Sequence, residues 1–176
     1  TKNIRFNDML GFSKEDVKYL MTEIDIPEEK QEELIPIIKE NYDGYIFSNM
    51  IKSEYENYKI YNSNMTLYFL NEYCRLKEIP KKLVDINILS DYRKIEAFMD
   101  LCQNMNKIEL LEKIVAEEPV ESELTEKFNA EISFGEKELI SLLFYLGYLT
   151  IKENEFGVLK FIIPNEVIRT IYSNYY

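Results

Sequence analysis

The apolar and polar positions of the chain follow two alternating periods, one typical of helices and the other typical of short strands. After Ser13, apolar side chains recur every three or four positions as far as Ile24, and Asp16 stands three positions after the serine, as in a capping box. Pro27 precedes an acidic turn, which favours the start of a second helix. This reasoning predicts helices at about residues 13–24, 28–42, 64–78, 92–103, 107–117 and 136–145, a short helical stretch at 124–129 and a terminal helix capped by Asn165.

Short extended segments are predicted where turn residues interrupt this helical pattern. The Asp43-Gly44 turn is followed by residues 45–47, which together with residues 58–61 favour a short β-hairpin around residues 49–57. Residues 120–124, which follow a proline, are also expected to be extended.

The last third of the chain has the clearest organisation. Residues 149–152 and 158–163 flank the turn residues 154–157 and predict a β-hairpin between two helices, which is typical of the back half of a winged helix. We therefore predict a mainly α (α+β) fold. A helical, lid-like part with a short hairpin would span residues 1–119, and a small winged-helix-like part would span residues 120–176.

Composition narrows the class of protein. With 176 residues, of which 46% are hydrophobic and 14% aromatic, the chain can build a sizeable core. Its 32 acidic and 21 basic residues give a formal charge of −11, which repels phosphate backbones and disfavours general nucleic-acid binding. No run approaches the roughly 20 apolar residues that cross a bilayer, and the N-terminus has no apolar signal core, so we expect no membrane partner and a cytoplasmic location.

Candidate chemistry is sparse. The chain has no histidine, which excludes Ser-His-Asp and Cys-His activation of a nucleophile, and Cys74 and Cys102 lack the spacing of a zinc site. No GxxxxGK[ST] loop can be formed from the five glycines, so the chain cannot bind ATP as a P-loop protein does. We therefore expect a segment that is not an enzyme and that holds no cofactor or metal. The five glycines are Gly11, Gly44, Gly135, Gly147 and Gly157.

Several sequence blocks, taken in order and with their spacing, resemble a known family. The chain is similar to the region that follows the nucleotide-binding core in the AAA-ATPase-like family of bacterial proteins, which usually also carry a C-terminal PD-(D/E)XK nuclease-like domain. Tyr42-Asp43-Gly44-Tyr45 is the best-known signature of this region. Two positions depart from the family pattern, since Ile46 stands where many members have Arg and Ser63 where many have Pro. The similar blocks are residues 7–17, 42–47, 61–62 with 67–70, 91–95, 147–151 and 163–169.

The resemblance implies a role within a larger protein. An ATPase core, with its ATP and Mg²⁺, would lie before Thr1, and a nuclease-like domain would follow Tyr176. Both would be partners in cis, and this chain would be a non-catalytic accessory segment that packs on the core and couples it to the nuclease-like domain. By this resemblance, the interface element would comprise Tyr42, Asp43, Gly44, Tyr45, Phe47, Tyr61 and Asn62. A second group would hold the winged-helix-like hairpin in place and comprises Gly147, Tyr148, Leu149, Pro164 and Asn165.

Other interpretations of the same residues remain open. A structural turn whose aromatic side chains belong to the core explains the Tyr42-Asp43-Gly44-Tyr45 stretch better than a contact site does. As a whole, the chain could instead be a nucleic-acid-binding winged-helix module, although the helix before the hairpin is acidic and apolar. An enzyme that uses carboxylates alone is a third possibility, for which Glu28-Glu29-Lys30 is a weak motif that helix capping explains better.

Overall fold

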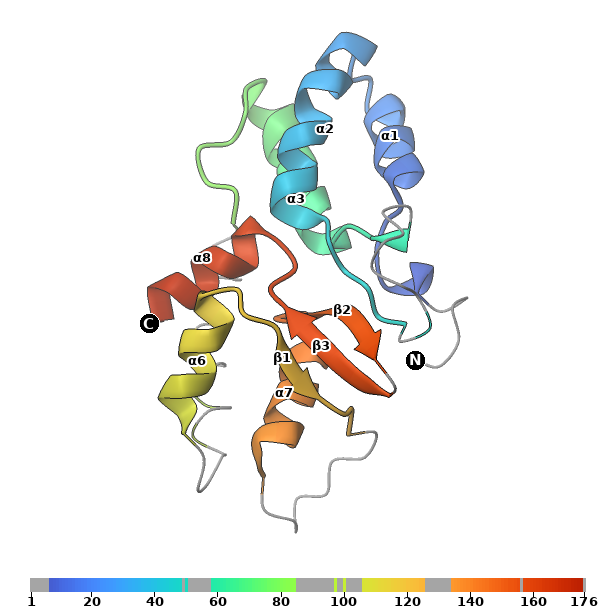
Figure 1. Cartoon of the computed structure of the whole chain (residues 1–176). Coiled ribbons are helices and arrows are strands. Elements are labelled where there is room, and N and C mark those ends of the chain that lie inside the picture. The colour runs from blue at the N-terminus through green and yellow to red at the C-terminus, as the bar shows by residue number, and fades with distance from the viewer. Residues whose placement is uncertain are drawn as a thin grey trace. The chain divides into compact units, whose positions relative to one another are not determined.

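The computed structural model describes residues 7–48, 50, 58–84, 97, 100, 106–125, 134–155 and 157–175 (Figure 1). Helices predominate, and the strands form one small antiparallel sheet, which confirms the mainly α (α+β) class. In chain order the elements are the 3-10 helix η2 (Asp8–Leu10), α1 (Lys14–Glu23), α2 (Glu28–Tyr42), α3 (Ser63–Leu76), α6 (Lys107–Val115), β1 (Val120–Ser122), α7 (Glu136–Tyr145), β2 (Thr150–Glu155), β3 (Val158–Ile162) and α8 (Glu166–Tyr175).

The chain packs as two compact units. Unit 1 comprises Thr1–Asp85 together with the short segment Asn165–Val167, and unit 2 comprises Ile86–Pro164 and Ile168–Tyr176. Unit 1 is therefore discontinuous in sequence. The long segment of unit 1 ends at Asp85, and unit 2 begins with the next residue. The domain boundary that was predicted from the sequence, at residue 119, stays a prediction.

Unit 1 is built on three helices, of which α1 packs against α2 and α2 against α3 (Figure 1). The capping box predicted at Ser13 is present: its Oγ accepts from the Asp16 N–H at 3.1 Å, and the Asp16 Oδ2 accepts from the Ser13 N–H at 2.8 Å. The apolar stripes of the helices face one another, and Met21, Ile38 and Phe69 are fully buried between them.

The hairpin predicted for residues 45–47 and 58–61 is not formed by strands. Two isolated antiparallel bridges stand in its place, Tyr45 with Ile60 and Phe12 with Tyr61. The reason is that the extended stretch is short: Asn62 already caps α3, its Oδ1 accepting from the Met65 N–H at 3.1 Å. The loop predicted at residues 49–57 lies outside the described residues except for Met50.

Unit 2 contains the sheet, whose strand order is β1-β3-β2 with both pairs antiparallel. A register shift between Ile151 and Glu153 bends β2 against β3. The apolar face of α7 supplies Leu143 and Phe144 to the core, and the Phe144 ring lies 5.4 Å from that of Phe161 on β3. The predicted hairpin near the end of the chain is thereby confirmed.

The helices predicted for unit 2 have mixed outcomes. Those at residues 136–145 and 107–117 are confirmed as α7 and α6, although α6 ends earlier, at Val115. The extended segment at residues 120–124 is confirmed over Val120–Ser122, as β1. The predicted helix at residues 92–103 lies almost entirely outside the described residues, as does most of the stretch at 124–129, whose first two residues are not helical.

Candidate functional site: a buried polar cluster in unit 1

Tyr42, the first residue of the Tyr42-Asp43-Gly44-Tyr45 stretch, belongs to the core of unit 1. It ends α2, its side chain has no solvent exposure, and its ring meets the edge of Phe69 at 6.0 Å. The hydroxyl donates to the Leu83 carbonyl at 2.7 Å. Burial, aided by the neighbouring Tyr68, raises the pKa of the Tyr42 phenol well above its usual range. The side chain is therefore a neutral structural anchor.

Asp43 and Gly44 form the turn that leads away from α2. The Asp43 N–H donates to the Lys39 carbonyl at 3.1 Å and closes the helix, and Gly44 has a φ of 104°, a conformation that favours glycine. Asp43 is only 7% exposed. Its main-chain carbonyl accepts a hydrogen bond from the Asn165 side-chain amide at 3.0 Å, which joins two residues that are 122 positions apart.

Tyr45 continues this stretch into the interior of unit 1. Its main chain exchanges two hydrogen bonds with Ile60, at 3.1 and 3.2 Å, and its ring stacks on that of Phe47 with centroids 5.8 Å apart. The phenol is fully buried, and burial raises its pKa. The side chains of Asn165 and Asn62, which lie beside the hydroxyl, act on this pKa in the opposite direction.

These contacts define one feature, which we call the Asn165 cluster: Asp43, Tyr45, Asn62 and Asn165. Asn62 contributes through both its cap on α3 and its main chain, since its N–H donates to the Tyr42 carbonyl at 2.8 Å. All members belong to unit 1. The structure thus brings Asn165 to the first group of signature residues, although the sequence had assigned it to the second. Two further residues of the first group lie next to the cluster. Tyr61 forms a β-bridge with Phe12, and the ring of Phe47 stacks on that of Tyr45.

The remaining members of the second group shape the connection from α7 to β2 in unit 2. Gly147 has a φ of 79°, and its N–H donates to the Phe144 carbonyl at 3.0 Å. The Tyr148 ring meets the edge of Tyr172 at 6.5 Å, and Leu149 is fully buried. Pro164, after β3, is partly buried. These residues hold the fold of unit 2 by packing.

Asn7 has a structural role that the sequence did not reveal. Its side chain is fully buried, its Nδ2 donates to the Tyr58 carbonyl at 2.7 Å, and its Oδ1 accepts from the N–H groups of Phe47 and Ser48 at 2.8 and 3.3 Å. The amide therefore ties three chain segments together. In the sequence, Asn7 was noted only as the first residue of one similar block. The spacing of apolar residues does not reveal a polar residue whose hydrogen-bond partners lie 40 or more positions away.

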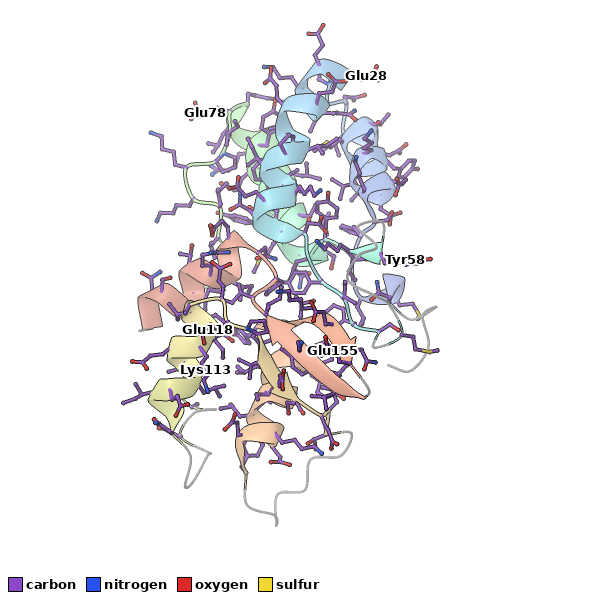
Figure 2. The ribbon with its side chains drawn as sticks, viewed as in Figure 1. Glu28, Tyr58, Glu78, Lys113, Glu118 and Glu155 are labelled. Carbon is purple, nitrogen blue, oxygen red and sulfur yellow. The ribbon has the colours of Figure 1, made fainter. Side chains whose placement is uncertain are left out.

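Among the described acidic and basic residues, Asp43 is buried, and most of the others are exposed. Among the described residues, no group of three or more histidine, cysteine, aspartate or glutamate side chains is placed to hold a metal ion. Glu28 and Glu78 lie at one end of the helices of unit 1, whereas Tyr58 lies at the other end (Figure 2). Glu28 is exposed in the acidic first turn of α2, which agrees with its interpretation as a helix-capping charge.

Comparison of the chain with protein-family models, with curated proteins and with solved structures finds no match. None of the helices in the described part of the chain combines the length and the apolar character needed to cross a membrane.

Proposed function

We propose that this chain is a non-catalytic accessory segment of an AAA-ATPase-like protein, which packs on the nucleotide-binding core and couples it to a nuclease-like domain. The observation that carries the proposal is the Asn165 cluster. Residues from three of the similar sequence blocks, represented by Asp43, Asn62 and Asn165, lie together around Tyr45, and both Asp43 and Asn165 are buried. Residues that are far apart in the sequence but pack together are expected to form one structural unit. The resemblance of all three blocks to the same family is the simplest explanation of this arrangement.

The topology of unit 2 supports the winged-helix-like part of the proposal. The described order α6, β1, α7, β2, β3, α8, with β3 between β1 and β2, is similar to that of a winged helix, in which β2 and β3 would form the wing. In the proposed role, unit 2 provides a surface on which other domains pack and supplies no catalytic group. ATP and Mg²⁺ belong to the core of the parent protein, and we infer a cytoplasmic location for the whole.

A nucleic-acid-binding winged helix is the alternative, and the charges of unit 2 count against it. On the wing, Lys160 contacts the carboxylates of both Glu153 and Glu155, at 3.2 and 3.0 Å. Lys137, on the helix that would enter the major groove, pairs with Glu123 at 2.7 Å. A phosphate backbone would have to displace these carboxylates, and the formal charge of −11 opposes its approach.

The proposal is tested first by the full reading frame of the gene. A P-loop upstream of Thr1 and a nuclease-like pattern downstream of Tyr176 are expected, and a native start codon immediately before Thr1 would contradict the proposal. In the full-length protein, Mg·ATP should bind, and a substitution of the P-loop lysine should abolish that binding. The 176-residue chain alone should bind no Mg·ATP in the same calorimetric assay.

The alternative is tested by fluorescence anisotropy with a labelled DNA duplex at about 50 mM salt, where electrostatic binding is strongest. The proposal expects no binding by the isolated chain. Salt-dependent binding that weakens in Lys152→Glu, a substitution on the wing strand β2, would favour the nucleic-acid-binding module instead.

A further inference from the structure

One end of unit 1 carries an exposed turn that is rich in lysine. Directly after α3, every residue from 77 to 82 is exposed except Pro80, which is buried. We call this segment the basic turn, and its residues are Lys77, Glu78, Ile79, Pro80, Lys81 and Lys82. It contains three lysines and one glutamate in a chain whose formal charge is −11, so the charge of this surface has the opposite sign to that of the whole molecule.

The basic turn is held in place by the residues beneath it. At its start, the Lys77 N–H donates to the Tyr73 carbonyl at 2.8 Å and closes α3. Directly after its end, the Leu83 carbonyl accepts from the hydroxyl of the buried Tyr42 at 2.7 Å. Pro80 restricts the main chain between these two points. The lysines therefore extend from a pre-formed surface, which lowers the entropy cost of binding a partner.

The lysines of the basic turn have no counter-charge among the described residues. None of the ion pairs in that part of the chain includes Lys77, Lys81 or Lys82. Two large apolar side chains lie among these cations in the sequence, Leu76 with 41% exposure and Ile79 with 46% exposure. Exposed apolar side chains among unpaired cations are complementary to an acidic protein surface.

An acidic surface of this kind lies at the same end of unit 1. Glu28 and Glu32 are one helical turn apart at the start of α2, both are exposed, and no ion pair between described residues includes either of them. Glu28 and Glu78, which belongs to the basic turn, lie at one end of the helices of unit 1 (Figure 2). Each copy of the chain thus carries both halves of a charge-complementary contact.

We propose that two copies of the chain associate through unit 1, with the basic turn of each copy on residues 28–32 of the other. Such a twofold contact is self-complementary, and its two halves are identical. This inference is independent of the proposed ATPase-associated function. Salt at physiological strength screens exposed charges beyond about 8 Å, so the charges that face each other outweigh the repulsion between the two chains as wholes.

The proposal is tested by sedimentation equilibrium of the full chain over a range of concentrations. The wild type should form dimers, and a wild type that stays monomeric up to about 1 mM would overturn the inference. Lys81→Glu with Lys82→Glu should weaken dimerisation at least about tenfold, because like charges then face each other at both contacts. Glu28→Lys with Glu32→Lys should have the same effect for the same reason. Unchanged dimerisation of either variant would also overturn the inference.

A mixture of these two variants tests the pairing of the two surfaces directly. In a mixed dimer, the reversed basic turn faces the reversed start of α2, and the two unaltered surfaces face each other. The mixture should therefore dimerise with about the wild-type constant, although neither variant dimerises well alone. This arm requires both variants to be folded, which far-UV circular dichroism verifies. Two folded variants that fail to associate when mixed would show that the basic turn binds elsewhere.

A general effect of net charge is separated from the proposed contact by a matched control. Lys14→Glu with Lys18→Glu changes the formal charge as much as the basic-turn variant does, but on exposed positions of α1, and should leave dimerisation unchanged. Equal weakening in this control would contradict the proposal. A monomeric wild type that binds vesicles containing an anionic phospholipid, with binding lost in the basic-turn variant, would assign the basic turn to a lipid surface instead.

Discussion

Gly11→Ala is expected to destabilise unit 1 for a purely steric reason. Gly11 has a φ of −170°, an extended conformation that any residue adopts, so the substitution introduces no backbone strain of its own. A Cβ at this position, however, would lie 2.4 Å from the Tyr61 carbonyl oxygen and 3.0 Å from the Ile60 Cδ1. Ordinary contacts begin at 3.4 Å, so the main chain of Tyr61 must move away.

The magnitude follows from what this movement breaks. The Tyr61 carbonyl accepts from the Phe12 N–H at 3.0 Å, and the Tyr61 N–H donates to the Phe12 carbonyl at 2.8 Å. Each of these bonds contributes about 0.5–1.5 kcal/mol, and overpacking of a well-packed site costs about 1–3 kcal/mol more. We therefore expect the free energy of unfolding to fall by about 2–6 kcal/mol, a large share of the about 5–15 kcal/mol typical of a folded domain.

Urea denaturation followed by far-UV circular dichroism measures this loss, and hydrogen exchange at Phe12 and Tyr61 locates it. Gly157→Ala is the control: nothing lies within 4 Å of its added Cβ, but its φ of +94° makes the substitution strained, at a cost of about 1–2 kcal/mol. That loss should leave exchange at Phe12 and Tyr61 unchanged. If Gly11→Ala keeps the stability of the wild type and the protection of these amides, the steric reasoning is refuted.

Three further outcomes are expected. Asn7→Ala should lower the free energy of unfolding by about 2–4 kcal/mol, because three main-chain groups that are buried or partly buried lose this partner. In urea denaturation, a loss no larger than that of Asn174→Ala, which removes an exposed bond, would contradict this. Ser13→Ala should cost about 0.5–2 kcal/mol through loss of the helix cap, and a thermal midpoint equal to that of the wild type would exclude this. Burial raises the pKa of Tyr42 and Tyr45 above the usual 10.0, so their contribution to stability is complete below about pH 10 and is lost as the pH rises beyond it. Urea midpoints should fall above about pH 10, less so in Tyr42→Phe, and a flat profile would disprove the argument.

The parts of the fold that were predictable are those encoded by local patterns. The helix after Ser13 and the helix at residues 136–145 were found because a cap or an apolar stripe determines each of them within a few residues. The hairpin predicted from residues 45–47 and 58–61 is reduced to the bridge between Tyr45 and Ile60, because the sequence did not show which residues compete for this pairing. Asn62 begins a helix directly after the short extended stretch, and Phe12 pairs with Tyr61 from far earlier in the chain.

The candidate site shows the limit of sequence reasoning more sharply. The signature residues Tyr42 and Tyr45 could be singled out, and the interpretation of this stretch as a turn with core aromatics agrees with their burial. Which polar groups meet could not be predicted, because the bonds of Asn7 and Asn165 span 51 and 122 positions. Periodicity records which face of an element is buried, but it does not record which buried amide finds which carbonyl.

The discontinuity of unit 1 has a consequence for its synthesis. A ribosome adds about 5–20 residues per second, so the Asn165 amide is made about 6–24 s after the Asp43 carbonyl that accepts its hydrogen bond, 122 residues earlier. During that interval the three helices of unit 1 have already emerged and can pack without residues Asn165–Val167. A ribosome stalled before Asn165 would therefore present the three helices of unit 1 without the side-chain amide that donates to the Asp43 carbonyl.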